Sequence, residues 1–474
     1  MSDRAWITWA VTLVTGLTVL RIWSIWITPT DLFVDEAQYW LWGQHLDFGY
    51  YSKPPLIAWV IRAFSGLGTV DPFWVRLPAP LFHFATSGAL AVIASSLWGK
   101  KTAAITAILY ISLPFVGVGS ALISTDTIMF PFLAGALGAY LNAAKSRSLV
   151  WAFLCGALLG IAAMGKYAAF YYVLCFALTM IALPAWRLSL GQIGLALFAC
   201  LIAISPNLHW NFVNGFSTAQ HTLDNADWVR DPGTRAAFSF ENLGSFLGAQ
   251  AIVLGPVVLV VMLVQIFRAP RRVEGQINSG LALMSCTILL IVSTQAFLSE
   301  AYANWAVAAY LPAALLVAKA LEIRPVLRAF ALGTNLIFCL ALLGAIAFAD
   351  RLKRPDGNFY LARYLGINAI SYEILNFAQG RPIIASNRDI LANLFFVKNA
   401  DQDVFAIPSV GRANNHYALK FAYPGGLTEL VYVRFASKDV PCSENDLGHI
   451  APTTGHYAGK SLAVSLIPGS CFSP

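Results

Sequence analysis

Apolar residues dominate this chain in runs long enough to cross a lipid bilayer. A membrane-spanning helix needs about 20 consecutive, mostly apolar residues. On this basis we predict eleven spans, over residues 6–28, 72–98, 102–121, 126–143, 149–164, 168–186, 190–206, 246–267, 279–297, 303–318 and 326–349. The pair 149–164 and 168–186 is short, with only Gly165-Lys166-Tyr167 between its members.

The basic residues between these runs fall in alternate loops. They are Arg4, Lys100-Lys101, Lys145 with Arg147, Arg187, Arg268 with Arg271-Arg272, and Lys319 with Arg324 and Arg328. Because short cytoplasmic loops are enriched in lysine and arginine, this face is predicted to be cytoplasmic. The opposite, extracytoplasmic face then receives residues 29–71, 122–125, 165–167, 207–245, 298–302 and 350–474.

Composition supports a polytopic membrane protein. The chain is 58% hydrophobic and 12% charged, whereas about 25% of the residues of a soluble domain are charged. The net charge of +7 follows from loop placement, and no basic patch interleaved with aromatic residues or Gly-rich phosphate loop is present, so we expect no nucleic-acid partner. The N-terminus lacks a nearby small-residue cleavage site, which indicates a retained first span.

Residues 350–474 differ in character from residues 1–349. They are richer in charge, carry turn signals, and alternate apolar with polar positions at 430–435 and 462–467, which is typical of strands. We predict a transmembrane domain over 1–349, with a first external loop at 29–71 containing interfacial helices, and a small extracytoplasmic α+β domain over 350–474. Cys442 and Cys471 are the two cysteines of this second domain, and an oxidising compartment favours a disulfide between them.

The acidic pair Asp35-Glu36, just beyond the first span, is the strongest candidate for chemistry. Carboxylates at a membrane boundary are costly unless they have a function. On a helix, residues four apart share a face, which groups Asp35 with Tyr39 and Glu36 with Trp40. The alternative is that both acids stabilise the first turn of an interfacial helix through its dipole.

Two lysines are candidates for binding a phosphate. Lys53 follows Tyr50-Tyr51-Ser52 and precedes two prolines that stiffen the backbone. Lys166, next to Tyr167, lies at the outer end of two short apolar segments, where an ammonium group needs an anion or water. For both lysines the alternative is a contact between the side chain and lipid headgroups.

Further polar residues are predicted on the same extracytoplasmic face. Asp126 opens a span within Ser124-Thr125-Asp126-Thr127, where it can bind substrate or cap the helix. His209, Asn211 and Arg230 belong to the loop predicted at 207–245, and His209 can orient an acceptor or bind a metal, although such loops are often just solvated. Glu300 precedes the span at 303–318. No cluster of Cys and His has metal-site spacing, so no metal ligand is predicted.

Together these motifs resemble the bacterial family 39 glycosyltransferases of GT-C architecture. That group includes protein O-mannosyltransferases, lipid A aminoarabinose transferases and galacturonosyltransferases of the lipopolysaccharide core. The resemblance extends over residues 6–320 and excludes the terminal domain. It rests on Asp35-Glu36, Tyr50-Tyr51-Ser52-Lys53-Pro54-Pro55, Asp126, Lys166-Tyr167, Pro206-Asn207 to Trp210-Asn211, and Asn304-Trp305.

The resemblance implies a polytopic GT-C fold and inverting transfer of a sugar from a polyprenyl phosphate. The acceptor is expected in lipopolysaccharide, lipid A or another envelope glycan, on the periplasmic side of a bacterial inner membrane. Asp35 would be the catalytic carboxylate, with Glu36 beside it, and Lys53, Lys166 and Arg230 would contact the donor phosphate. The expected substrate-binding residues are Tyr39, Tyr50, Tyr51, Asp126, Tyr167, His209, Asn211 and Glu300.

One departure from the family pattern narrows these expectations. Aminoarabinose transferases have a glutamate before the lysine of this motif, where this chain has Ser52. That difference argues against a bound metal and a cationic amino sugar; no cofactor is indicated, and dependence on a divalent metal stays open. The identity of the sugar stays open, because the three cations Lys53, Lys166 and Arg230 suit an acidic sugar as well as a phosphate.

The same residues are compatible with other functions. A hydroxyl acceptor needs a base such as Asp35, whereas a phosphate acceptor does not, and Asp35 would then position the sugar or the acceptor. A protein acceptor is the first alternative. A lipid-linked sugar transporter has less support, because transporters place ionisable residues near the bilayer midplane within repeated, broken helices, and here the charges lie at span ends.

Overall fold

The computed structural model describes residues 2–224, 238–268, 275–438 and 442–472 and divides the chain into two compact units. The helical unit comprises Met1–Trp23, Ser52–Ile57 and Arg76–Leu343, and the sheet unit comprises Ser24–Tyr51, Ala58–Val75 and Gly344–Pro474. The last boundary between the two units lies between Leu343 and Gly344, whereas the sequence predicted it after residue 349. Most of the first external loop, which was predicted as part of the transmembrane domain, belongs to the sheet unit.

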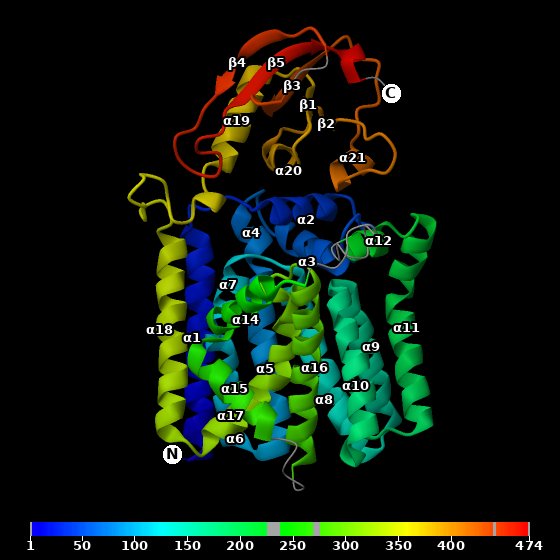
Figure 1. The fold of residues 1–474 in the computed structure, drawn as a ribbon, viewed down its shortest axis with the longest axis vertical. Coiled ribbons are helices and arrows are strands. Elements are labelled where there is room, and N and C mark those ends of the chain that lie inside the picture. The colour runs from blue at the N-terminus through cyan, green and yellow to red at the C-terminus, as the bar shows by residue number, and fades with distance from the viewer. Residues whose placement is uncertain (1, 225–237, 269–274, 439–441, 473–474) are drawn as a thin grey trace. The chain divides into compact units, whose positions relative to one another are not determined.

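The helical unit is built from helices, most of which are apolar (Figure 1). They are α1 (Asp3–Ile27, whose last residues belong to the sheet unit), α5 (Pro78–Trp98), α6 (Lys100–Ser112), α7 (Pro114–Ala121), α8 (Thr125–Ser146), α9 (Leu149–Gly165), η1 (Tyr167–Phe170), α10 (Tyr171–Ala182), η2 (Pro184–Trp186), α11 (Leu190–Val213), α12 (Ser217–Asp224), α14 (Phe240–Leu254), α15 (Pro256–Arg268), α16 (Gln276–Leu298), η4 (Ala303–Ala309), α17 (Tyr310–Glu322) and α18 (Pro325–Ala347).

Every predicted span coincides with helix, but not every span is a straight, long helix. In the described part of the chain, seven segments are long and apolar enough to cross a membrane. Two predicted spans, 102–121 and 246–267, are instead bent pairs: α6 and α7 meet at 57°, and α14 and α15 at 111°. The segments 149–164 and 168–186 form the shorter apolar helices α9 and η1–α10.

Proline and glycine explain both bends. Proline lacks a backbone N–H and disfavours helical geometry in the residue before it. Accordingly, Leu113, before Pro114, is extended (φ −61°, ψ 137°), and Gly255, before Pro256, has a φ of 84°. The runs of apolar residues alone did not predict these breaks, although Pro114 in the first run and Gly255-Pro256 in the second indicate them.

The loop predicted from residue 207 begins later than expected. Helix α11 continues to Val213 through Pro206. Asn207, His209 and Asn211 are therefore helical, and the sequence-based loop assignment was wrong for them.

Two glycines allow α9 to approach α11 closely. Gly156 and Gly160 are four residues apart on α9, a spacing that brings transmembrane helices into contact. A Cβ atom at Gly156 would lie 1.9 Å from the carbonyl oxygen of Ala196, and one at Gly160 would lie 2.7 Å from that of Cys200. The absence of side chains at these two positions fixes the distance between the two helices.

Replacement of Gly156 by alanine is expected to destabilise the helical unit by about 1–3 kcal/mol, because the added methyl group forces the backbones apart. Thermal unfolding of the purified protein in detergent measures the loss. Gly194→Ala on α11 is the matched control, since a Cβ at Gly194 meets no atom within 4 Å. Equal stability of the two variants would contradict the close-packing argument.

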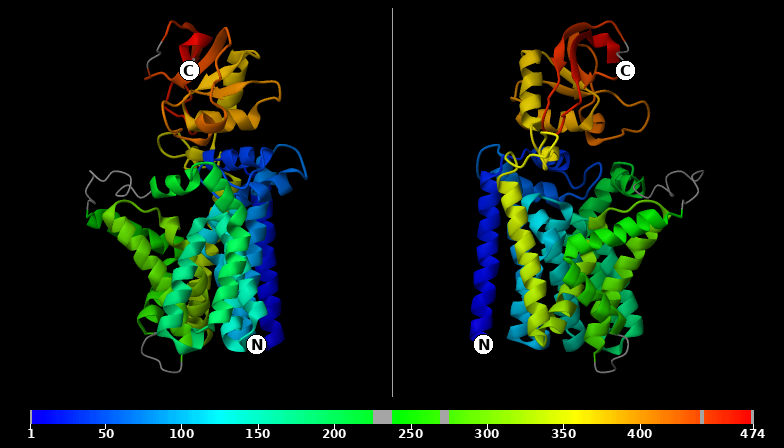
Figure 2. Two further views of the ribbon diagram at one scale, coloured as in Figure 1. Left: turned by 90° about the vertical axis from the view of Figure 1, so that its right-hand side faces the viewer. Right: turned by 60° about the vertical axis from the view of Figure 1, so that its left-hand side comes forward.

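The sheet unit contains a five-stranded sheet in the order β2-β1-β3-β5-β4. Its strands are drawn in orange to red (Figure 2). Strand β1 is parallel to β2 and β3, while β5 is antiparallel to β3 and β4. The elements of the unit are α2 (Val34–Gln44), α3 (Leu56–Ser65, which begins in the helical unit), α4 (Pro72–Arg76, which ends there), η5 (Ala362–Tyr364), α19 (Ile367–Ala378), β1 (Ile383–Ala385), α20 (Arg388–Val397), β2 (Val404–Ala406), α21 (His416–Lys420), β3 (Glu429–Phe435), β4 (Asn445–Ile450), β5 (Leu462–Pro468) and η6 (Gly469–Phe472).

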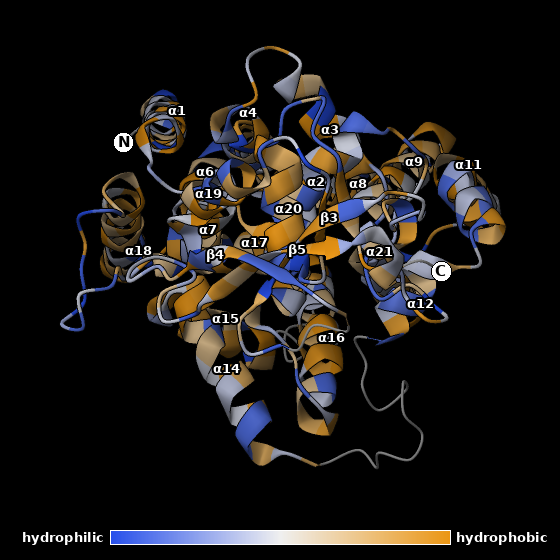
Figure 3. Cartoon of the chain, turned by 90° about the horizontal axis from the view of Figure 1, so that it is seen from above, coloured by the Kyte–Doolittle hydropathy of each residue, from blue (hydrophilic) through white to orange (hydrophobic). Residues whose placement is uncertain are grey.

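The strands predicted at 430–435 and 462–467 are confirmed as β3 and β5. Both are buried and apolar, whereas the edge strand β4 is polar and largely accessible (Figure 3). A disulfide joins Cys442 to Cys471, and both cysteines pack against the core formed around Leu430 and Ile467. The bridge thus ties the segment before β4 to the end of the chain.

Helix α2 is part of the sheet unit because it packs on α20. The rings of Trp40 and Phe396 meet edge to face with centroids 5.0 Å apart. Just before α2, the Asp31 carboxylate accepts hydrogen bonds from the backbone N–H groups of Ile367 (2.7 Å) and Asn368 (3.3 Å), at the first turn of α19. A segment near the N-terminus is thereby built into the C-terminal fold.

Candidate functional site

Glu36 has a structural task at the start of α2. It is the third residue of the helix, and its carboxylate accepts a hydrogen bond from the Phe33 backbone N–H at 3.0 Å. Its side chain is buried, and an acid at this position accepts a hydrogen bond from a backbone N–H group that has no partner within the helix. This arrangement agrees with the helix-start alternative, and a catalytic role for Glu36 stays a prediction.

Asp35 has a different environment. Its side chain is 45% exposed, and it forms an ion pair with the Nη2 group of Arg388. The Nε group of Arg388 donates a second hydrogen bond to the amide oxygen of Gln38, at 2.9 Å. Burial opposes the charge of Arg388, but the Asp35 carboxylate outweighs it, and the pKa of Arg388 is raised. One exposed carboxylate is thus held beside a fixed guanidinium group.

Arg388 is positioned by the start of α20. It is the first residue of that helix, and Asn387 before it accepts hydrogen bonds from the backbone N–H groups of Asp389 (2.7 Å) and Ile390 (3.3 Å). Sequence reasoning missed Arg388, which lies 353 residues from Asp35. A signal was present: the polar run Ser386 to Asp389 directly follows a strand of a parallel pair, where α/β folds place their binding residues.

Three of the four tyrosines predicted to bind substrate, Tyr39, Tyr50 and Tyr51, are buried in the sheet unit. The Tyr50 ring stacks on Trp42 at 4.7 Å, and its hydroxyl donates to the Trp42 carbonyl oxygen at 3.0 Å. Burial raises the pKa of Tyr50. Tyr39 packs against the same Trp42, and the Tyr51 hydroxyl donates to the Ala413 carbonyl oxygen at 3.2 Å. These contacts account for all three residues as packing groups, and their contact with substrate stays a prediction.

His416 is buried against the same tryptophan. Its ring meets Trp42 edge to face at 5.5 Å, and only 6% of the residue is exposed. Burial, with Lys420 and other cations nearby, lowers the pKa of His416 to about 3. An unfolded histidine titrates near 6.5, so the folded protein excludes a proton that the unfolded chain binds. Stability is therefore complete above about pH 6.5 and is lost as the pH falls towards 3.

We expect acidification from pH 7 to pH 5 to cost the sheet unit about 2 kcal/mol through His416. His416→Phe should remove this component of the pH dependence, because phenylalanine does not titrate. The measurement is denaturant unfolding at both pH values, with hydrogen exchange of the backbone amides of β1 and β3 as the probe of the sheet unit. His449→Phe, at an exposed histidine of β4, should keep the wild-type dependence, and identical pH profiles for all three proteins would refute the assignment.

In the helical unit, Asp126 and Lys166 form an ion pair. Asp126 lies in the first turn of α8, which Ser124 caps, and Lys166 directly follows the last residue of α9. The Lys166 ammonium group lies 2.8 Å from each carboxylate oxygen, and Asn304 donates to the carboxylate at 3.4 Å. The side chain of Lys166 is 20% exposed and that of Asp126 is 11% exposed. An ammonium group has three N–H donors, and these two contacts to Asp126 use two of them.

Tyr167 and Asn211 are also brought together, with Asn207 as their common partner. The Tyr167 hydroxyl donates to the Asn207 side-chain oxygen at 2.6 Å and accepts from the Asn211 side-chain amide at 3.1 Å. Asn207 and Asn211 are four residues apart on α11 and share a face. His209 lies between them on a different face and is exposed, so the structure does not bring it to this network.

Two further predicted residues lie on other segments of the chain. Lys53 is half-buried in the segment Ser52–Ile57 of the helical unit, followed by the buried Pro54 and Pro55. Glu300 is exposed between α16 and η4. Arg230 lies outside the described residues. Among the residues that were described, no group of three or more His, Cys, Asp or Glu side chains is arranged to hold a metal ion.

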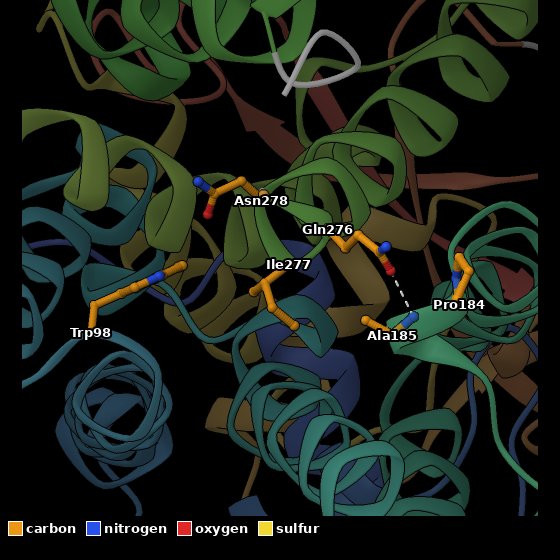
Figure 4. A pocket seen from close by; sticks show the side chains of 7 residues that line it. Trp98, Pro184, Ala185, Gln276, Ile277 and Asn278 are labelled. Carbon is orange, nitrogen blue, oxygen red and sulfur yellow. Dashed lines mark hydrogen bonds between the residues drawn. The ribbon is translucent and has the colours of Figure 1, made fainter. Parts of the chain in front are cut away.

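A cavity of about 660 Å³ lies at the other end of the helical unit (Figure 4). It is lined by Trp98, Pro184, Ala185 and the start of α16, where Gln276 accepts a hydrogen bond from the Ala185 backbone N–H at 2.7 Å. Tyr140, towards the end of α8, donates to the Trp186 carbonyl oxygen, whereas Asp126 lies at the start of α8. The cavity is thus remote from Asp126, and none of the described residues that line it is charged.

The fold is that of the GT-C membrane glycosyltransferases. The structure is similar to that of ArnT from Cupriavidus metallidurans bound to undecaprenyl phosphate, with a TM-score of 0.68, 14% identity, and 98% of this chain and 99% of that chain covered. It also resembles the oligosaccharyltransferase of Archaeoglobus fulgidus in complex with Zn and sulfate, with a TM-score of 0.53, 14% identity, and 90% and 67% coverage.

The sequence places the chain within this class. It is 34% identical over 470 residues to the lipid A galacturonosyltransferase RgtD of Rhizobium johnstonii, with 98% of each chain covered. Residues 52–210 match the family described as dolichyl-phosphate-mannose-protein mannosyltransferase. The chain belongs to the GT-C glycosyltransferase family that contains these proteins, and the predicted family and enzyme class are confirmed.

Proposed function

We propose that the protein transfers a galacturonosyl residue from a polyprenyl phosphate to lipid A or a related lipopolysaccharide acceptor. The observation that carries this proposal is the identity of 34% with a lipid A galacturonosyltransferase along essentially the whole chain. A polyprenyl phosphate carrier agrees with the undecaprenyl phosphate bound by the similar ArnT. The placement of the basic residues supports transfer on the periplasmic face of an inner membrane.

The proposed chemistry is an inverting displacement at the anomeric carbon. The acceptor hydroxyl oxygen forms a bond to that carbon as the bond to the phosphate oxygen breaks, and the hydroxyl proton passes to Asp35. The departing polyprenyl phosphate keeps the electron pair, and Lys53 and Lys166 offset its charge. Fixed charges of this kind are often the largest contribution to catalysis, because they need no reorganisation in the transition state.

A test uses the purified full chain in lipid nanodiscs with polyprenyl-phosphate galacturonate and lipid A. Mass spectrometry should show lipid A carrying one added uronosyl group. A second reaction offers polyprenyl-phosphate mannose and a peptide rich in serine and threonine, the substrates that the matching mannosyltransferase family suggests. Modification of the peptide but not of lipid A would replace the proposal by protein glycosylation.

A further inference from the structure

Arg388 lies next to the carboxylate that the proposed function assigns as the base. Its Nη2 group contacts Asp35 and its Nε group contacts Gln38, so one edge of the planar guanidinium is occupied by two residues of α2. The opposite edge, formed by Nη1 and the second hydrogen of Nη2, has no hydrogen bond to the described residues. The Arg388 side chain is 37% exposed, which leaves part of it accessible to a ligand.

Stability does not account for this ion pair. Exposed ion pairs contribute little to folding, and the side chains of Asp35 and Arg388 are 45% and 37% exposed. Arg388 is nevertheless fixed by Gln38 and by the capped start of α20. A guanidinium that is held in place, accessible and adjacent to the proposed base is arranged for binding rather than for packing.

The charge of the sugar explains why a cation is needed there. A uronosyl group carries a carboxylate on C5, which is separated from the anomeric carbon only by the ring oxygen. When the anomeric carbon approaches Asp35, two carboxylates come close together and repel each other. A guanidinium beside Asp35 offsets this repulsion and can bind the second carboxylate through two parallel hydrogen bonds. A neutral hexose makes no such demand.

We propose that Arg388 binds the carboxylate of the transferred sugar and selects acidic over neutral donors. This inference rests on the proposed function and adds the residue that recognises the sugar. Gln38 serves as a positioning residue, because it holds the Nε side of the guanidinium and directs the opposite edge away from α2. Lysine is a poor substitute, since its ammonium group lacks the planar fork that matches a carboxylate.

The test compares two donors that differ only in the substituent on C5, polyprenyl-phosphate galacturonate and polyprenyl-phosphate galactose, with the wild type, Arg388→Gln and Arg388→Lys. We expect the wild type to prefer galacturonate. Arg388→Gln should reduce the ratio of kcat/KM values for the two donors by about 10- to 100-fold, which is the size expected for a lost hydrogen-bonded charge contact. For Arg388→Lys, this ratio should lie between those of the wild type and Arg388→Gln. Arg381→Gln is the control, because Arg381 is equally exposed at 37% and pairs with Glu429 in the same unit.

The outcomes separate the inference from the function on which it rests. An equal fall in kcat/KM for both donors in Arg388→Gln would show that Arg388 only orients Asp35, and wild-type kcat/KM values with both donors would also overturn the proposal. Wild-type protein that transfers neither sugar would refute the proposed function itself. Should Arg388→Gln fail to fold, Arg388→Lys and Gln38→Leu still test the proposal, since both are expected to lower the preference for galacturonate.

Discussion

Asp35→Asn is expected to lower kcat by about 100- to 10,000-fold, the range that a positioned general base contributes. Asparagine has nearly the same size as aspartate but cannot take the proton of the acceptor hydroxyl. Donor binding should be largely retained, because the cations proposed to hold the phosphate are unchanged. The measurement is steady-state transfer together with binding of a fluorescent polyprenyl-phosphate analogue.

The control for this variant is Asp356→Asn. Asp356 is 58% exposed and pairs with Arg354 in the same unit, so its loss tests the effect of removing an ion-paired carboxylate distant in sequence from α2. It should leave kcat unchanged. Full activity in Asp35→Asn would remove Asp35 from proton transfer and point to an acceptor that is already ionised, such as a phosphate.

Asp126→Ala is expected to destabilise the helical unit by about 3–5 kcal/mol, because it leaves the Lys166 ammonium group in a largely buried position without its carboxylate. The double variant Asp126→Ala with Lys166→Met should recover much of this loss, since neither charge remains. A double-mutant cycle on thermal unfolding in detergent isolates the energy of the pair.

The matched comparison for this cycle is the pair of Lys319 and Glu322 in α17. These side chains also lie 2.8 Å apart, but the lysine is 35% exposed and the residues are neighbours on one helix. Removing this pair should cost only about 0.3–0.5 kcal/mol. If the two cycles gave the same energy, burial would not be the factor that makes the Asp126–Lys166 pair important.

Much of the helical unit could be predicted from the sequence, because a bilayer forces each span to be apolar over a set length. The bends at Pro114 and Gly255 were not predicted, because hydropathy averaged over a segment does not reveal the effect of single residues. Lys166 and Asp126 were each selected, but their pairing was not, since hydropathy carries no information about which helices are neighbours. The pairing could have been predicted from the rule that a buried charge needs a partner of opposite charge.

The sheet unit was harder to predict for a different reason. Strands β3 and β5 follow a local alternation of apolar and polar residues, so they were found. The contact of Asp35 with Arg388 depends on the packing of α2 against α20, and no local pattern links segments so distant in the chain. The contact of Tyr50 with substrate stays a prediction: its place in the motif Tyr50-Tyr51-Ser52-Lys53 did not show that its ring stacks on Trp42.

The sheet unit is assembled from segments near both ends of the chain, and this has a consequence for biosynthesis. Ribosomes add about 5–20 residues per second, so Arg388 emerges tens of seconds after Asp35. During that interval α2 has left the ribosome without the helix on which it packs, and the proposed base lacks its guanidinium partner. The proposed base therefore gains its guanidinium partner only after residue 388 has been translated, and a chain truncated after the final membrane span would insert without it.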